Sequence, residues 1–180
     1  WRASARRGSS VRGRPALVFG GAGTESTPMR ISLVDFGQAV FAVAADTGET
    51  LWTRDVALFE GTILTGGIVQ YASKLIVPLS AMGVGFGGDP NYECCKSHGA
   101  VRALDADTGR ILWTAHMTPD AKPTYRNSLG VQQWGPSGAS VWTTPTVDAQ
   151  RNLVYVGTGQ NSSSPACLLY TSDAADDRLS

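Results

Sequence analysis

The sequence has little charge and no surplus of either sign. Its 180 residues include 15 basic and 15 acidic side chains, so the formal net charge is zero, and charged residues make up only 17% of the chain. A chain without a basic surplus offers nothing that would attract nucleic acid or an anionic membrane surface. It also has no apolar run near the ~18–20 residues that a membrane-spanning helix needs. The composition therefore predicts neither a nucleic-acid partner nor a membrane span.

The motifs of several enzyme classes are missing as well. The sequence has no G-x-S-x-G nucleophile elbow, no Ser/His/Asp order and no phosphate-binding loop. Histidine occurs only at His98 and His116, and neither forms a zinc-binding pattern with the cysteines. The sequence therefore carries no signature of acyl transfer, of a P-loop or of a zinc site.

Glycine, by contrast, is abundant. The chain contains 21 glycines and five tryptophans beside its few charges. This combination is typical of an all-β chain built from short strands and tight turns.

One phrase of the sequence occurs twice. Phe41–Trp52 reads FAVAADTGETLW, and Val101–Trp113 reads VRALDADTGRILW. Each copy has two short strand patterns around an Asp-Thr-Gly turn, which predicts a β-hairpin. Because the turn and the tryptophan recur together, the two hairpins form an internal repeat, and we expect both tryptophans to pack between repeats.

A pair of apolar strand patterns also occurs twice. Ile63–Gln70 and Lys74–Leu79 precede the second hairpin, and Val141–Val147 and Leu153–Val156 follow it. Two strands and a hairpin make four strands per unit, which is the pattern of a β-propeller blade.

The second unit is longer than a usual blade. Trp52 and Trp113 are 113 − 52 = 61 positions apart, whereas propeller repeats span about 40–50 residues. The excess lies in Ser80–Gly99, a glycine-rich insertion that contains Cys94 and Cys95. Such insertions map to one face of a repeat fold, where binding sites are built.

Cys94 and Cys95 are neighbours in the sequence. Adjacent cysteines can close a vicinal disulfide, which strains the backbone and needs an oxidising compartment such as the bacterial periplasm. The alternative is a pair of free thiols, one buried and one exposed. The spacing alone does not separate the two.

Two further features have a structural and a functional interpretation. Trp142, at the start of a strand, is either a core residue or an aromatic floor for a planar cofactor. Gly157–Asn161, GTGQN, is either a polar turn or a source of amide oxygens for a hard cation such as Ca²⁺. It lacks the third glycine of a nucleotide fingerprint.

Taken together, these motifs resemble the quinoprotein alcohol dehydrogenases, which use pyrroloquinoline quinone (PQQ), and in particular their polyvinyl-alcohol dehydrogenase branch. The matching residues are the two hairpins AADTGETLW and DADTGRILW, the segment DPNYECC at Asp89–Cys95, and GPSGASVWTTPTVDAQRNLVYVGTGQN at Gly135–Asn161. The resemblance covers Pro15–Asn161. It implies an eight-bladed β-propeller, of which this chain would supply about two to three four-stranded blades.

The resemblance also implies a site. A disulfide between Cys94 and Cys95 would cover one face of PQQ, Trp142 would lie under the other face, and Ser140 would place a hydroxyl near the cofactor. A Ca²⁺ ion would bridge quinone and protein, and Gln160 and Asn161 are its candidate ligands here.

The implied reaction is oxidation of a small or polymeric alcohol. Hydride passes to PQQ, and a cytochrome c-type acceptor then takes the electrons. The family's aspartate base comes later in its sequence, so we expect it beyond this chain. The resemblance further implies a periplasmic protein and allows haem c in a further domain.

The chain departs from the family at three positions. The stretch that usually carries a glutamate ligand of Ca²⁺ reads Ser80–Gly83 and has no carboxylate. Gln160 stands where asparagine is usual, and Lys96–His98 stand where a cofactor-pairing arginine is common. A non-catalytic propeller that serves as a protein-interaction scaffold is therefore the alternative. The cysteine pair favours the enzyme, since a scaffold has no use for it.

The two ends differ from the rest. Residues 1–14 show no periodicity and are expected to be irregular, while residues 15–165 form the partial propeller. Cys167–Asp177 resembles the conceptual translation of a sequencing adapter, so residues 166–180 are expected to be a non-native tail. Because about two to three blades leave open sheet edges, we expect the chain alone to be a catalytically inactive fragment.

Overall fold

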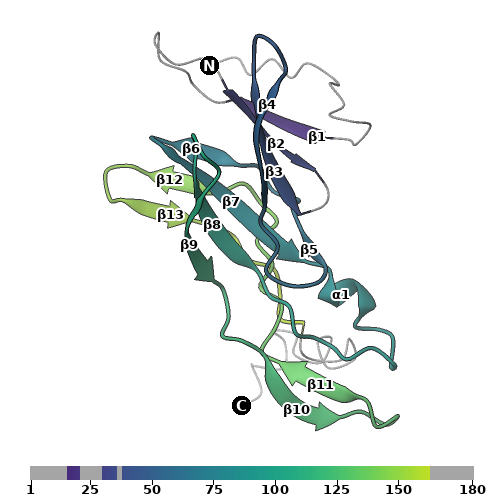
Figure 1. Cartoon of the computed structure of the whole chain (residues 1–180). Helices are drawn as coiled ribbons and strands as arrows, with labels where there is room; N and C mark the ends of the chain where they lie inside the picture. The colour runs from purple at the N-terminus through teal and green to yellow at the C-terminus, as the bar shows by residue number, and fades with distance from the viewer. Residues whose placement is uncertain (1–15, 21–29, 36–37, 163–180) are drawn as a thin grey trace.

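A computed structural model describes residues 16–20, 30–35 and 38–162 (Figure 1). Within these residues the fold is all-β apart from one short helix, α1 (Gly83–Phe86), as the composition predicts. The described part contains no helix long and apolar enough to cross a membrane. The predictions for residues 1–14 and 166–180 lie outside the described residues.

The first sheet is an antiparallel meander. Its strands, in spatial order, are β1 (Ala16–Gly20), β2 (Arg30–Asp35), β3 (Ala39–Ala44) and β4 (Thr50–Asp55). The first predicted hairpin is confirmed as β3–β4, whose turn includes Gly48 at φ +73°. Glycine adopts this left-handed conformation without a steric penalty. This sheet is one blade of the propeller.

The second sheet has five strands around a long central one. They are β5 (Thr62–Ile63), β6 (Val69–Tyr71), β7 (Lys74–Ala81), β8 (Ala100–Asp105) and β9 (Ile111–His116). The second predicted hairpin is confirmed as β8–β9. Its turn is tied by the carboxylate of Asp105, which accepts hydrogen bonds from the backbone N–H and the hydroxyl of Thr108 at 2.9 and 2.8 Å.

Two of the predicted strands are shorter than expected. Ile63–Gln70 is broken into β5 and β6, because Gly66 between them lies against another segment and a Cβ there would be 2.7 Å from the carbonyl oxygen of Thr143. Only the end of Val141–Val147 is a strand, β12 (Thr146–Asp148), since Pro145 before it has no N–H to donate. β12 pairs with β13 (Leu153–Tyr155).

A further hairpin was not expected from the sequence. β10 (Lys122–Arg126) and β11 (Gln132–Gly135) pair within the long connection after β9. Figure 1 shows this hairpin projecting at the end of the molecule farthest from the first sheet. Every residue of β10 is exposed, so this strand carries no alternating apolar pattern that could have predicted it.

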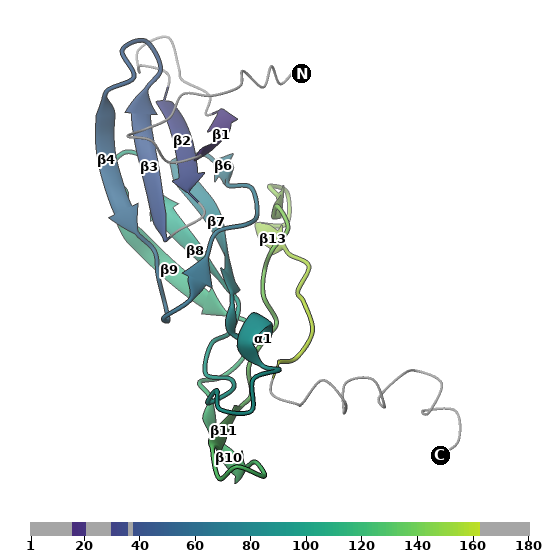
Figure 2. The ribbon, with the colours of Figure 1, turned by 90° about the vertical axis from the view of Figure 1, so that its right-hand side faces the viewer.

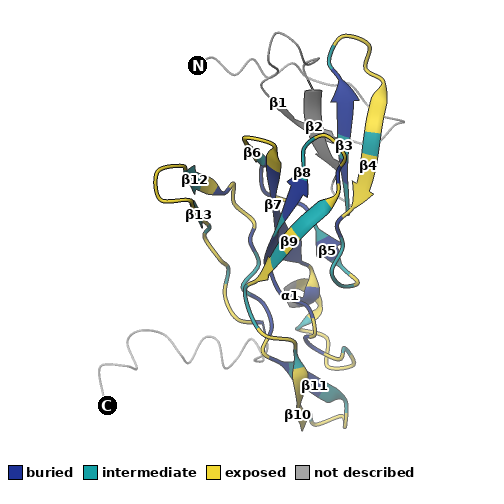
Figure 3. Cartoon of the chain, turned by 60° about the vertical axis from the view of Figure 1, so that its left-hand side comes forward, coloured by how far each residue is buried: buried dark blue, intermediate teal, exposed yellow. Residues whose placement is uncertain are grey.

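Strand β7 is buried on both faces. Alternate side chains of a strand point to opposite faces. Leu75, Val77 and Leu79 pack in a cluster with Val40 of the first sheet, while Ile76 packs in a second cluster toward the β12–β13 side. Figures 2 and 3 show the second sheet between these two neighbours, and β7 is buried, in dark blue, after its exposed first residue.

Trp52 joins the two blades through the repeated turn. Its indole N–H donates to the carbonyl oxygen of Ala106 at 3.2 Å, and its ring covers Gly109, where a Cβ would lie 2.5 Å from the ring. Arg54 donates to the Gly109 carbonyl at 2.8 Å. The expected packing between repeats therefore holds for Trp52. Trp113 is 39% exposed and makes no such contact among the described residues.

We predict that Gly109→Ala destabilises the protein more than Gly48→Ala. Both glycines have positive φ, +67° and +73°, so each alanine meets a similar left-handed penalty. Only at Gly109 does the added methyl collide with Trp52, which adds about 1–3 kcal/mol of overpacking. Urea unfolding of the two variants, followed by circular dichroism, measures the difference. Equal losses of unfolding free energy would contradict the Trp52 packing.

Candidate functional site

Cys94 and Cys95 form a disulfide with each other, which resolves the alternatives that the spacing left open. The peptide bond between them is cis, and the side chains are buried. Trp134 of β11 holds this pair through the main chain: its N–H donates to the Cys94 carbonyl at 2.7 Å, and its carbonyl accepts from the Cys95 N–H at 3.3 Å. The β10–β11 hairpin therefore fixes the disulfide in place.

Two other segments approach the sulfur atoms. The Sγ of Cys94 lies 3.3 Å from the carbonyl oxygen of Ser162, and that of Cys95 lies 3.6 Å from the carbonyl oxygen of Gly83. A Cβ on Gly83 would lie 2.7 Å from the Oγ of Ser97. Position 83, at the stretch where the resemblance expects a carboxylate, is thus next to the disulfide, but Ser97 occupies the space a side chain would need.

Ser140 is bonded to the end of β7. Its hydroxyl oxygen accepts from the N–H of Ala81 at 3.2 Å and lies 3.5 Å from the carbonyl oxygen of the same residue. The N–H of Val141 donates to the Leu79 carbonyl at 3.2 Å. The segment around Ser140 is therefore attached to β7, and in this structure the hydroxyl serves that attachment.

Trp142 is not a core residue. Its side chain is 60% exposed, so the core interpretation, which a strand position favoured, is wrong. A Cβ on Gly159 would lie 3.6 Å from the indole nitrogen, and no side chain of that residue covers the ring. An exposed indole beside a glycine is available to stack on a planar group.

The segment with Gln160 and Asn161 runs beside the residues before Trp142. The N–H of Gly159 donates to the Ser140 carbonyl at 2.8 Å, and the Ala139 N–H donates to the Gln160 carbonyl at 2.9 Å. Asn161 pairs with Gly138 in an isolated antiparallel bridge. Both amide side chains are exposed.

Glycines allow these segments to approach closely. A Cβ on Gly99 would strike the carbonyl oxygen of Ala139, and a Cβ on Gly138, at φ +89°, would strike that of Gln160. These contacts bring the cysteine segment, the Ser140–Trp142 segment and residues 159–162 together. All the site residues expected from the sequence thus lie on three adjoining segments.

Lys96 is paired with Glu93 and Trp134. Its Nζ forms an ion pair with Glu93 at 2.6 Å and lies 4.4 Å from the centroid of the Trp134 ring. The hydrogen bond and the charge of Lys96 lower the pKa of the exposed Glu93 carboxyl. Lys96 is therefore engaged on the exposed side of the cysteine segment, whereas His98 is buried.

The structure brings together three residues that the sequence analysis did not combine. The Nε2 of His98 lies 2.8 Å from the Nδ1 of His116, and Asp120 is close to both. The signal was present in the second hairpin, whose register pairs Ala100 with His116. His98 precedes Ala100 by two residues, so this register places the backbones of the two histidines near one another.

Comparison with known proteins agrees with the fold. The profile of the PQQ family described as glucose/ethanol/alcohol dehydrogenase, β-propeller domain, matches residues 67–166, more than half of the chain. The chain therefore belongs to this family.

Two relatives are both described as polyvinylalcohol dehydrogenases. The polyvinylalcohol dehydrogenase of Sphingopyxis sp. (strain 113P3) is 42% identical over 76% of this chain and 21% of its own length, and that of Pseudomonas sp. is 40% identical over 71% and 20%. The chain thus spans about a fifth of the length of these relatives.

A solved structure shares the fold. The quinohaemoprotein alcohol dehydrogenase from Comamonas testosteroni superposes with a TM-score of 0.54 and 22% identity, over 74% of this chain and 20% of its own. The partial β-propeller inferred from the repeat is thereby confirmed.

We predict that Ser140→Ala destabilises the protein in the absence of any cofactor. The substitution leaves the backbone of the buried Ala81 without its hydroxyl partner, which costs about 1–3 kcal/mol. Ser128→Ala, at an exposed turn, is the matched control and should change stability by less than about 0.5 kcal/mol. Thermal unfolding measures both. If the two variants unfold alike, the hydroxyl does not fasten this segment to β7.

Proposed function

We propose that the protein containing this chain is a PQQ-dependent alcohol dehydrogenase. The observation that carries the proposal is the disulfide Cys94–Cys95, set in the family-matched region beside the segment that bears the exposed Trp142. A propeller that served only as a scaffold would need neither feature.

The donor and stacking groups of the site suit a planar quinone. Trp142 offers an open aromatic face, and stacking on it adds about 0.5–1.5 kcal/mol beyond burial. Gly159 leaves the edge of the indole uncovered. The disulfide supplies a wall without charge or side-chain freedom, and Gln160 and Asn161 add amide donors and acceptors for polar groups. These residues would hold PQQ.

A bound cation would rest on oxygen ligands other than the usual glutamate. Ser80–Gly83 carries no carboxylate, and Ser97 closes the space beside Gly83. Amide and main-chain oxygens are accepted ligands of Ca²⁺. We therefore assign Gln160 and Asn161 as the candidate cation ligands within this chain, together with groups from the rest of the protein.

The chemistry is oxidation of an alcohol to a carbonyl compound, for which PQQ supplies the two-electron acceptor. Trp142 would hold the cofactor by stacking, and the segment at Cys94 and Cys95 would help to exclude water from it. Proton removal from the alcohol falls to a base on a later part of the protein. The electrons would pass to a cytochrome c-type acceptor or a haem c domain, in the periplasm where a disulfide persists.

Two relatives support a choice of substrate class. Two proteins that share 40–42% identity with the chain are described as polyvinylalcohol dehydrogenases. We propose a secondary alcohol, in polymeric form, as the substrate to test first. The absence of a carboxylate at Ser80–Gly83 keeps a non-catalytic propeller as the second candidate.

We predict that Trp142→Leu abolishes most of the PQQ-dependent activity while Trp113→Leu does not. Both tryptophans are partly exposed, at 60% and 39%, but only Trp142 adjoins the site. In the full-length protein reconstituted with PQQ and Ca²⁺, Trp142→Leu should weaken PQQ binding about tenfold or more, as expected for a loss of at least 1.4 kcal/mol. PQQ titration and dye-linked oxidation of polyvinyl alcohol measure both effects.

The outcomes separate the two candidate functions. Activity that requires PQQ and is lost in Cys95→Ser supports the dehydrogenase. A folded full-length protein that binds no PQQ would contradict it and leave the scaffold.

A further inference from the structure

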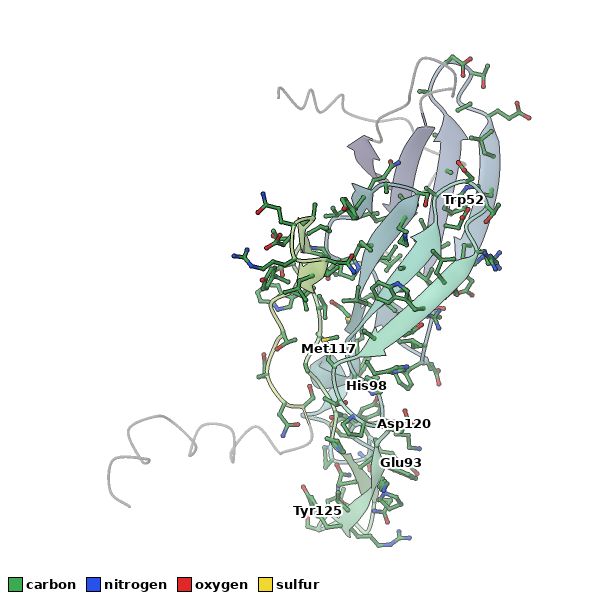
Figure 4. All side chains as sticks on the ribbon, turned by 90° about the vertical axis from the view of Figure 1, so that its left-hand side faces the viewer. Trp52, Glu93, His98, Met117, Asp120 and Tyr125 are labelled. Carbon is green, nitrogen blue, oxygen red and sulfur yellow. A yellow bond between two sulfur atoms is a disulfide. The ribbon has the colours of Figure 1, made fainter. Side chains whose placement is uncertain are left out.

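A cluster of metal-ligating side chains is formed by residues other than those assigned to PQQ. His98 follows the disulfide, His116 ends β9, and Asp120 lies in the connection to β10. Their ligand atoms all lie within 4.8 Å of one another. Figure 4 shows His98 and Asp120 close together below the end of β9, between the second sheet and the β10–β11 hairpin. Two parts of the chain thus converge at one point, the residues after the disulfide and the end of β9 with the connection that follows it.

The two imidazoles lie close enough to coordinate one cation. The Nε2 of His98 and the Nδ1 of His116 are 2.8 Å apart. Nitrogen ligands on a tetrahedral Zn²⁺, at about 2.0–2.1 Å from the ion, lie about 3.3 Å apart. A small rotation of the exposed His116 ring would make this change. Asp120, also exposed, can then approach with a carboxylate oxygen.

His98 is the buried member of the cluster. The residue is 1% exposed, and its ring packs edge-on against Phe59, with ring centroids 4.6 Å apart. Burial, and then the neighbouring His116, lower the pKa of His98, and Asp120 offsets part of this shift. The ring nitrogen Nε2 faces the two exposed members of the cluster, His116 and Asp120.

Within the described residues, the ring of His98 has few hydrogen bonds. Its Nδ1 is buried and has no hydrogen-bond partner among the described residues, so the contact with His116 is its one polar link there. A neutral hydrogen bond contributes only about 0.5–1.5 kcal/mol. Such a bond competes weakly with coordination to a divalent cation.

We propose that His98, His116 and Asp120 form a binding site for a borderline divalent cation of the Zn²⁺ type. Two imidazole nitrogens and one carboxylate oxygen are the donor set such ions prefer, whereas Ca²⁺ prefers oxygen alone. Three protein ligands leave one tetrahedral position to water. The site is distinct from the amide oxygens of Gln160 and Asn161, and it does not depend on the proposed dehydrogenase function.

A bound cation would restrain the residues around this cluster. A cation at this point ties the end of β9 and the start of its connection to β10 to the residues directly after the disulfide. His98 is three residues from Cys95, so the cation would hold the C-terminal side of the disulfide segment. The expected role is therefore structural support of that wall.

The test uses the full-length protein without PQQ, stripped of metals by a chelator and kept in excess Ca²⁺ so that any oxygen-ligand site is filled. Co²⁺ is the probe, because its visible absorption reports tetrahedral nitrogen and oxygen coordination, and Zn²⁺ is the competitor. We expect one equivalent of Co²⁺ to bind and to be displaced by Zn²⁺. His116→Gln and Asp120→Asn should each weaken binding at least about tenfold.

Glu49→Gln, an exposed carboxylate on the first hairpin, is the matched control and should bind as the wild type does. Both test substitutions are at exposed positions, so circular dichroism should show an unchanged fold. Failure to bind one equivalent, or the same affinity in all variants, would overturn the site. Because PQQ is absent, this result is independent of whether the protein is a dehydrogenase.

Discussion

The structure depends on the burial of β7 from both sides. Alternate side chains from Leu75 to Leu79 face the first sheet, and Ile76 faces the β12–β13 side. A strand that is apolar on both faces is stable only when a layer covers each of them. The end of this strand also positions the site, since Ala81 holds Ser140 and Gly83 adjoins the disulfide. The same strand, β7, therefore determines both the packing between blades and the position of the site.

The site itself is assembled mainly by the main chain. Gly99 lies against the carbonyl of Ala139, and Gly138 against that of Gln160, at distances that exclude any Cβ. Main-chain contact fixes neighbouring segments with less freedom than contact between long side chains, whose rotamers must each be ordered. Side chains such as that of Trp142 then remain exposed for a ligand. Main-chain contacts thus fix the segments of this glycine-rich site, and its side chains do not need to do so.

The features predicted correctly from the sequence are those that neighbouring residues determine. The Asp-Thr-Gly turns defined both hairpins, and the apolar run at β7 defined the central strand, because turn preference and burial pattern are properties of neighbouring residues. The break at Gly66 and the exposure of Trp142 depend on segments far away in the chain, and no local pattern reports them. The β10–β11 hairpin was missed because its exposed strand has no periodicity, although Asn127 and Gly130 are a readable turn signal.

The position of the disulfide segment is set by neighbouring segments rather than by the disulfide. The bond between Cys94 and Cys95 links adjacent residues, so it cannot restrain the segment relative to the rest of the fold. That restraint comes from the main chain of Trp134 in β11, and from Gly138, whose N–H donates to the Ser97 carbonyl and whose carbonyl accepts from the Gly99 N–H. His116 of β9 adds a hydrogen bond to His98. The connection between β9 and β10 joins two of these supports, so a cation that ordered this connection would also restrain the disulfide segment without touching either sulfur.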